Sequence, residues 1–133
     1  MLKGSIVALI TPFQNNTLNE DVYRKLIHYH LKNVTNGIVP GGTTGESPTL
    51  SHDEHKKIIE IAVNECNGKI PVIAGTGSNS TSEAVDLSKY AEKAGSDALL
   101  VVTPYYNKPT QEGLYQHYKK INDNVGIPII IYN

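Results

Sequence analysis

The chain has 133 residues, a length that suits a single domain. Its 12 basic and 13 acidic residues nearly cancel and form no basic stripe, which argues against a nucleic-acid-binding surface. The single cysteine excludes an internal disulfide and fits a reducing compartment. No apolar run approaches the roughly 20 residues of a membrane span, and the N-terminus lacks the apolar core of a signal peptide. We therefore expect a soluble cytoplasmic protein that binds neither nucleic acid nor membranes.

Five short apolar runs rich in β-branched residues recur along the chain. They are continuously apolar rather than alternating, which predicts parallel strands buried on both faces. Their spacing of about 30 residues is the size of a strand–helix unit. The runs cover residues 5–10, 37–39, 70–74, 98–102 and 127–131.

Helical patterns fill the four gaps between these runs. Asn19 and Thr110 are predicted to cap the first and fourth helices, and residues 51–54 and 80–83 have the pattern of a capping box. Apolar residues at helical spacing predict one inward face for each helix. In chain order these faces are Val22, Leu26 and Tyr29; Ile58, Ile59, Ala62 and Val63; Ala84, Ala91 and Ala94; and Leu114, His117, Tyr118 and Ile121.

The order of elements is four strand–helix units followed by a fifth strand, which predicts an α/β fold. Parallel strands joined by crossover helices leave two architectures, a doubly wound sheet or a TIM barrel. A complete barrel is typically about 250 residues long. We therefore expect residues 1–133 to be the N-terminal half of one TIM (β/α)8 barrel domain, about (βα)4 plus strand five.

Polar residues follow every predicted strand, at the edge where parallel α/β folds bind ligands. In strand order they are Thr11; Thr43, Thr44 and Glu46; Thr76, Ser78 and Asn79; Thr103, Tyr105, Tyr106, Asn107 and Lys108; and Tyr132 and Asn133. Aligned hydroxyls at this edge can relay protons without a charged base. The competing interpretation is structural, because the ring of a strand-end tyrosine often packs in the core while its hydroxyl stays in contact with water.

The most informative of these segments is residues 42–47, in which Thr43 and Thr44 stand between two glycines. Glycine lets the backbone approach a small substrate, and hydroxyls with free amides can hold a carboxylate. An ordinary loop rich in glycine and threonine by turn chemistry is the alternative.

Two other patterns are weaker indications of function, one for nucleotide binding and one for metal binding. Residues 75–77 begin like a dinucleotide-binding loop, but the third glycine and the acidic ribose partner are missing, which argues against a Rossmann-like nucleotide binder. His52 and His55 lie one helical turn apart and could form half a metal site. Their place beside a helix cap favours a solvated helix end instead. We therefore predict no metal and no cofactor.

The motifs at residues 42–47, 71–77, 103–109 and 111–115 resemble those of the dihydrodipicolinate synthase (4-hydroxy-tetrahydrodipicolinate synthase) family. The resemblance covers all 133 residues in the right order. It implies a TIM-barrel lyase that condenses pyruvate with aspartate semialdehyde in lysine and diaminopimelate biosynthesis. It also implies pyruvate held as a Schiff base on a lysine, no metal or organic cofactor, and a homo-oligomer, which in the family is a tetramer.

The resemblance also suggests roles for individual residues. Thr43 resembles the threonine that relays protons, and Tyr132 the tyrosine that protonates and orients the Schiff base. Tyr106 resembles the tyrosine lent to a neighbouring subunit's site, and Thr44 a binder of the pyruvate carboxylate. The positions where lysine-inhibited members bind lysine correspond to Ser47, His52, His55, Asn79, Glu83 and Tyr105. Pro48 departs from the family pattern, in which small residues often occur at that position.

The resemblance puts the Schiff-base lysine on a sixth strand and a carboxylate-binding arginine after the fifth, beyond residue 133. Lys108 lies in a loop and Arg24, the only arginine, in a helix. The 133 residues by themselves are therefore expected not to carry out the condensation. Two other functions stay open: a different pyruvate-dependent aldolase such as N-acetylneuraminate lyase, and a non-catalytic half-barrel module.

Overall fold

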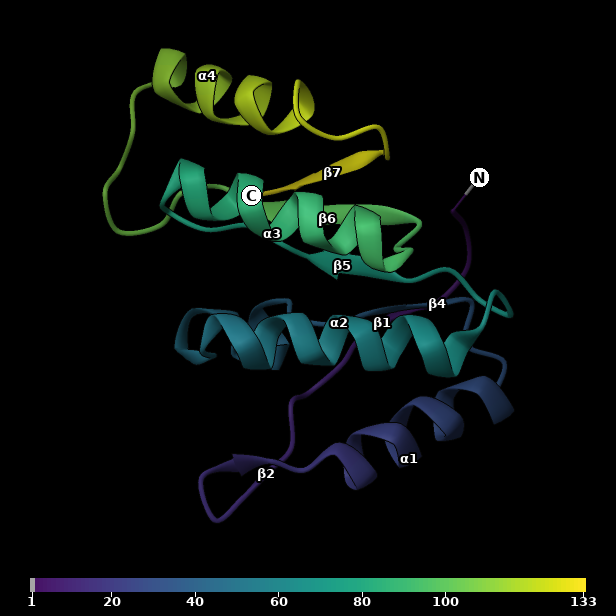
Figure 1. Ribbon diagram of the computed structural model, residues 1–133. Helices are drawn as coiled ribbons and strands as arrows, with labels where there is room; N and C mark the ends of the chain where they lie inside the picture. The colour runs from purple at the N-terminus through teal and green to yellow at the C-terminus, as the bar shows by residue number, and fades with distance from the viewer. Residues whose placement is uncertain (1) are drawn as a thin grey trace.

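A computed structural model describes residues 2–133 (Figure 1). Its main elements are β1 (Ile6–Ala8), α1 (Glu20–Lys32), β4 (Gly37–Val39), α2 (His52–Cys66), β5 (Ile73–Gly75), α3 (Thr81–Ala94), β6 (Ala98–Val102), α4 (Gln111–Asn122) and β7 (Ile129–Tyr132). The predicted order of strands and helices is confirmed. The apolar pattern missed a short hairpin, β2 (Phe13–Gln14) and β3 (Thr17–Leu18), and two single-turn 3-10 helices, Thr43–Gly45 and Ser47–Thr49. No helix within residues 2–133 is long and apolar enough to cross a membrane.

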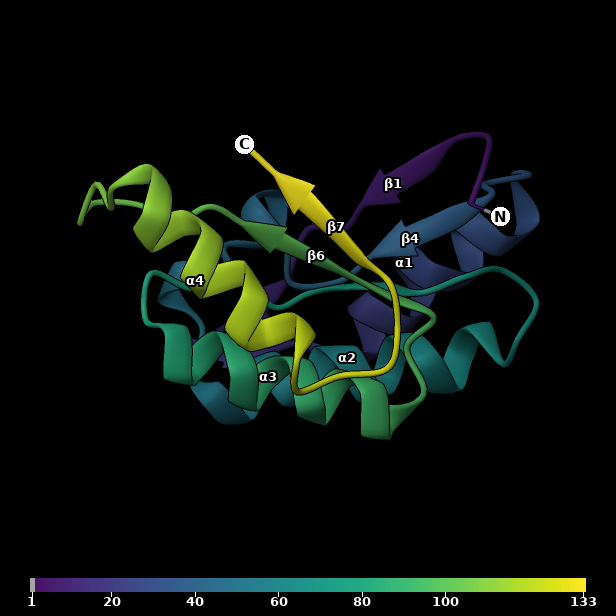
Figure 2. The ribbon, with the colours of Figure 1, turned by 90° about the horizontal axis from the view of Figure 1, so that it is seen from above.

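The five main strands are parallel, and each lies beside the next one in the chain. β1 pairs with β4, and β5, β6 and β7 form a continuous sheet. A bridge between Ile38 and Val72 joins β4 to β5. All four helices lie on the same side of the strands (Figure 2), whereas a doubly wound sheet carries helices on both faces. The architecture is therefore a partial TIM barrel, as predicted.

Consecutive strand residues contribute to two different layers of the core, because side chains along a strand alternate between its faces. Ile38 and Leu99 pack under the helices. Val39, Ile73 and Ala98 form a separate cluster on the other face. Both faces of the central strands are thus buried, which accounts for their continuously apolar sequence.

Local sequence explains α2 well. The Ser51 side chain accepts from the amide of Glu54, and the Glu54 carboxylate accepts from the Ser51 amide at 2.8 Å, which completes the predicted capping box. Ile58, Ile59 and Ala62 are fully buried, as the helical spacing predicts. Asn19 and Thr110 cap α1 and α4 through their side chains, also as predicted.

The predicted inward face of α1 is wrong. Val22 and Tyr29 are 39 % and 61 % exposed, whereas Tyr23 and Ile27 are fully buried. The two candidate stripes are neighbours on the helix, and packing against α2 decides between them. Because the Tyr23 ring carries a polar tip on a large apolar body, the pattern undervalued it as a core residue.

The predicted capping box of α3 is also absent. The Ser80 side chain makes no capping hydrogen bond and instead contacts the hydroxyl of Ser82. The Glu83 carboxylate turns away from the helix start to Ser78 and His52. A carboxylate gains more from these two donors, one of them on another helix, than from one backbone amide.

The outermost strands depart from the expectation that every strand is buried on both faces. Ile6 in β1 is 37 % exposed, and Ile131 in β7 is 60 % exposed. Each of these strands has one neighbouring strand among the described residues, since β1 pairs only with β4 and β7 only with β6. The two apolar edges are the places where further barrel strands would pair.

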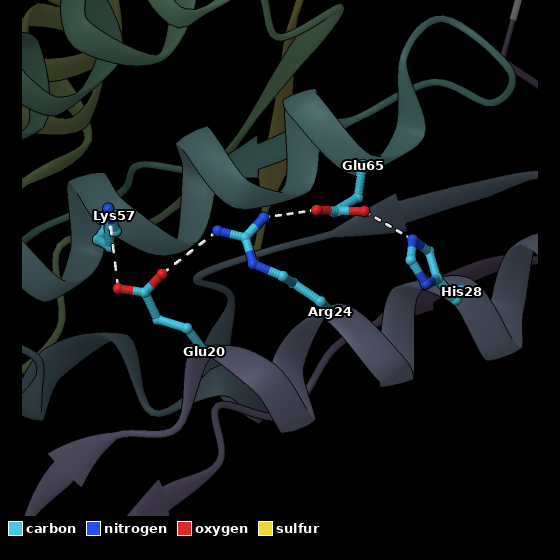
Figure 3. A network of polar contacts seen from close by, with 5 residues as sticks. All are labelled: Glu20, Arg24, His28, Lys57 and Glu65. Atoms are coloured by element: carbon cyan, nitrogen blue, oxygen red, sulfur yellow. Dashed lines mark hydrogen bonds and ion pairs between the residues drawn. The ribbon is translucent and has the colours of Figure 1, made fainter.

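A chain of ion pairs joins α1 to α2 on the outer surface (Figure 3). Arg24 lies 3.3 Å from Glu20 on its own helix and 2.5 Å from Glu65 on α2. Lys57 reaches Glu20 at 3.7 Å, and His28 reaches Glu65 at 2.6 Å. These side chains are partly exposed to solvent, which screens the ion pairs, so we expect each pair to stabilise the fold only modestly.

Candidate active site

A cleft of about 310 Å³ opens at the carboxyl ends of β4, β5, β6 and β7. Its hydroxyl-bearing walls come from Thr43, Ser47, Tyr105 and Tyr132. Of these, the sequence predicted Thr43, Tyr105 and Tyr132 as strand-end residues. Its remaining backbone wall comes from glycines, namely Gly41, Gly42, Gly75 and Gly77. The cleft therefore offers hydroxyls and bare backbone to a small ligand, at the edge that the sequence predicted.

Glycine is required where two of these walls meet. A Cβ on Gly75 would lie 2.3 Å from the carbonyl oxygen of Gly41, and Gly41 itself has a φ of +66°. The Gly75 amide donates to the carbonyl of Pro40 at 2.8 Å. The ends of β4 and β5 are thereby packed backbone to backbone, which keeps this side of the cleft free of side chains.

Thr43 and Thr44 lie on the 3-10 turn that follows β4. The turn is closed by the amide of Gly45, which donates to the Gly42 carbonyl at 3.0 Å, and by Glu46, whose φ is 61°. Both threonines are exposed, but only Thr43 lines the cleft. Thr44 belongs to the same turn and lies just outside the lining.

Tyr132 is the last residue of β7 and lines the same cleft as Thr43, which follows β4. The amide of Thr103 donates to its carbonyl at 2.9 Å, and Val102 of β6 is its register partner. No hydrogen bond joins the Tyr132 and Thr43 side chains within residues 2–133. A ligand that bridged the two hydroxyls would lie in the cleft between them.

A second, smaller cavity of about 50 Å³ lies beside the cleft, and the two share Ser47, Pro48, Gly77 and Tyr105. Five of the six residues expected at a lysine site line it, namely Ser47, His52, His55, Glu83 and Tyr105. The sixth, Asn79, is not among its lining residues, and its carbonyl accepts from the side chain of Asn107 at 3.1 Å. The fold therefore gathers most of this predicted set in one place.

Glu83 carries the charge of the smaller cavity. The Ser78 hydroxyl donates to its carboxylate, and His52 also bonds to it. These contacts hold the pKa of Glu83 below its ordinary value, with the Ser78 hydrogen bond as the largest cause. Sequence reasoning named Ser78 as a strand-end residue but missed it as a partner of Glu83, since the contact depends on how the loop after β5 turns.

His55 corrects the prediction of a solvated helix end. Its side chain is buried, and Nε2 donates to the carbonyl of Gly75 at 2.7 Å. Burial lowers the pKa of His55, which favours the neutral ring. The reason is tertiary, because the first turn of α2 lies over the end of β5 instead of facing water. No group of three or more potential metal ligands occurs within residues 2–133.

Tyr106 lies apart from both cavities of its own chain. It is 93 % exposed and has a φ of 71°, which turns it out of the loop that follows β6. Lys108 in the same loop is not among the cleft residues, and no other lysine within the described range lines the cleft. Of the three residues expected to be catalytic, the fold brings together Thr43 and Tyr132 only.

Fold and site together define a chain of the TIM-barrel class with a small-molecule cleft at the carboxyl ends of its strands. The sequence profile described as the Dihydrodipicolinate synthetase family matches residues 1–133, and the chain belongs to that family. The resemblance seen in the sequence motifs is thereby confirmed.

The chain is 72 % identical over 133 residues to the 4-hydroxy-tetrahydrodipicolinate synthase of Pelagibacter ubique (strain HTCC1062), covering 100 % of this chain and 45 % of that protein. It is similar to the chloride-inhibited dihydrodipicolinate synthase of Acinetobacter baumannii complexed with pyruvate, with a TM-score of 0.97, 51 % identity, and coverage of 100 % and 46 %. It is also similar to the enzyme of Cyanidioschyzon merolae with lysine bound, with a TM-score of 0.93, 37 % identity, and coverage of 98 % and 45 %. The chain spans just under half the length of these relatives.

Proposed function

We propose that residues 1–133 are part of a 4-hydroxy-tetrahydrodipicolinate synthase, which condenses pyruvate with aspartate semialdehyde in lysine and diaminopimelate biosynthesis. The observation that carries the proposal is one cleft lined by both Thr43 and Tyr132. Curated relatives between 57 % and 72 % identical to the chain bear that enzyme's name. We further propose that the enzyme works in the cytoplasm.

In the proposed reaction, the amine of a lysine outside these residues adds to the keto carbon of pyruvate and then expels water. The departing oxygen leaves as water only after it has gained protons. Tyr132 and Thr43 are proposed to carry those protons, because a hydroxyl both donates and accepts. Loss of water leaves an imine, and one of these hydroxyls is proposed to take a proton from its methyl carbon, which gives an enamine. The enamine carbon attacks the aldehyde of the second substrate, and the new alkoxide takes a proton back from the same hydroxyls.

Thr44 is proposed to bind the carboxylate of pyruvate. Its exposed position on the 3-10 turn, next to Thr43, supports this role. A carboxylate held on the turn would place the keto carbon of pyruvate within the cleft that Thr43 lines. The glycine walls leave the backbone bare, so a small ligand can approach it closely.

Tyr106 is proposed to complete the site of a neighbouring subunit in a homotetramer. Its near-complete exposure and left-handed backbone support the proposal. The relay would then be Thr43 and Tyr132 from one subunit with Tyr106 from another.

The smaller cavity is proposed to bind lysine as an inhibitor. Glu83 supplies a carboxylate for an ammonium group, and His52, His55, Asn79, Ser47 and Tyr105 surround it or lie close by. The relative from Cyanidioschyzon merolae, whose structure has lysine bound, supports the assignment. Ser47 and Tyr105 line both cavities, so a ligand bound in the smaller cavity would contact residues that also line the larger cleft.

The test is a chimeric enzyme in which residues 1–133 are continued by the part of the Pelagibacter ubique relative that follows its matching segment. Borohydride should trap pyruvate on it covalently, and it should consume pyruvate and aspartate semialdehyde together. Cleavage of N-acetylneuraminate without that condensation would point to a different aldolase. A folded chimera with neither activity and no trapped pyruvate would indicate a non-catalytic module.

A further inference from the structure

Thr11 lies three residues after the end of β1 and contacts the turn that carries Thr43 and Thr44. Thr11 is only 6 % exposed, and its Oγ1 donates to the carbonyl oxygen of Gly45 at 2.7 Å. Pro12 comes next, and a proline holds the backbone of the residue before it in the extended region. The backbone of Thr11 is therefore restrained by its own segment and does not depend on the turn that its side chain contacts.

The other hydrogen bonds of the turn are local. The Gly45 amide donates to Gly42, the Glu46 amide donates to Thr43, and the Glu46 carbonyl accepts from Thr49. Within residues 2–133, the bond from Thr11 is thus the one hydrogen bond that ties residues 43–46 to a different strand. A turn held only by its own bonds could move as a unit, whereas the Thr11 bond anchors it to the end of β1.

The turn also lies directly on the chain near the end of β1. A Cβ on Gly45 would lie 2.9 Å from the carbonyl oxygen of Leu9 and 3.1 Å from Thr11 Oγ1. Leu9 is itself held, because its amide donates to the Val39 carbonyl at 3.0 Å. The segment from Leu9 to Thr11 is therefore held against β4, and it lies in close contact with the turn at Gly45.

We propose that Thr11 is a positioning residue: its hydroxyl holds the turn so that Thr43 lines the cleft and Thr44 stands beside it. The inference rests on the proposed function, in which those two threonines act on pyruvate. Thr11 touches neither cavity, so it acts only through the Gly45 carbonyl. Displacement of a reacting group by about 1 Å can cost about a hundredfold in rate, so loss of the anchor should lower kcat.

Thr11→Val tests this in the chimeric enzyme, because valine keeps the shape and removes the donor. We expect kcat, counted per site that borohydride traps with pyruvate, to fall by about 10- to 100-fold. Thr11→Ser restores the hydroxyl and should recover most of the lost kcat. Amide hydrogen exchange at Gly45 and Glu46 should be faster in Thr11→Val, whether or not the enzyme is active.

Ser88→Ala is the matched control. Ser88 is fully buried and shares a hydrogen bond of 2.9 Å with Thr76, between α3 and the segment after β5. It should lower the melting temperature while leaving kcat per site and exchange in the turn unchanged. The inference is overturned if Thr11→Val keeps its kcat and slow exchange, if Thr11→Ser fails to recover, or if Ser88→Ala matches the loss. An unmutated enzyme without condensation activity would refute the proposed function, and the exchange data would still decide the role of Thr11.

Discussion

His55 Nε2 lies 2.7 Å from the carbonyl oxygen of Gly75 and thereby ties the first turn of α2 to the end of β5. Because a carbonyl only accepts, Nε2 carries the proton. The same ring stands close to Gly41, where a Cβ would lie 2.6 Å from Nε2. Gly41 and Gly75 line the larger cleft and His55 lines the smaller cavity, so one histidine supports the walls of both.

Replacing His55 should lower the free energy of unfolding, because the Gly75 carbonyl would lose its hydrogen-bond donor. His55→Phe removes the donor and leaves the buried Gly75 oxygen without a partner, which should destabilise the fold by about 1–3 kcal/mol. His55→Gln offers an amide donor and should recover part of the loss. Urea unfolding of both variants provides the measurement, and a phenylalanine variant as stable as the original would show that the bond contributes nothing.

Stability should fall as the pH drops below about 6.5, the ordinary histidine value. Burial lowers the pKa of His55 and of His117, so the unfolded chain binds these protons more readily than the folded one. Their contribution is fully present above that pH and is lost as the pH falls towards the lowered pKa values of the folded state, with a limiting slope of about 1.4 kcal/mol per pH unit for each proton. Melting temperatures between pH 7 and 5 should show the decline, and a double change to glutamine should flatten it. An unchanged slope in the double variant would assign the decline to other groups.

Loss of the Thr43 hydroxyl should damage turnover far more than folding. In the chimeric enzyme, Thr43→Val should lower kcat by about 10²–10⁴-fold, the usual loss for a positioned proton-transfer group. Its melting temperature should change little, because the side chain is exposed. Thr17→Val, in β3 and outside the cleft, is the control and should keep full turnover. Equal turnover for the two variants would leave Thr43 with a loop-forming role only.

Gly75 should not tolerate a side chain, whereas Gly42, which lies directly beside it, should. Gly75→Ala would place Cβ 2.3 Å from the Gly41 carbonyl oxygen, so the backbone must shift, and we expect a loss of about 1–3 kcal/mol. Gly42→Ala meets its nearest atom at 3.5 Å and should change stability by less than about 1 kcal/mol. Denaturant midpoints of the two variants test the difference. Equal midpoints would mean that the ends of β4 and β5 are less tightly packed than the structure indicates.

The polypeptide of residues 1–133, made by itself, should self-associate. Ile6 and Ile131 are exposed on two strand edges whose backbone groups lack a second neighbour, and such edges promote pairing between copies. Light scattering at micromolar concentration should detect oligomers, and a dye for apolar surface should bind. A cooperative monomer with no dye binding would contradict the expectation.

The sequence predicted best where one segment decides its own structure. The start of α2 depends on Ser51 and Glu54, three residues apart, and the predicted capping box is present. The start of α3 has the same pattern and fails, because Glu83 finds His52 on another helix. Identical local chemistry therefore gave two outcomes, and the difference lies in a contact 31 residues away.

The candidate site divides in the same way. The strand-end positions of Thr43 and Tyr132 follow from the order of apolar runs, since parallel strands bring their carboxyl ends to one edge. Which of the strand-end hydroxyls share a cleft does not follow from that order, as the outward turn of Tyr106 shows. That turn depends on the backbone path of one loop, which the polar residues of the loop leave open.

By itself the sequence determined the alternation of strands and helices, three of the four helix caps, and the edge that carries the polar residues. These features depend on hydrogen bonds and apolar spacing within a few residues, so each segment specifies them alone. The tertiary structure decided the buried face of α1, the burial of His55 and the anchoring of the Thr43 turn by Thr11. Each of these joins groups at least 20 residues apart or depends on a neighbouring helix, and such contacts exist only once the strands have been brought side by side.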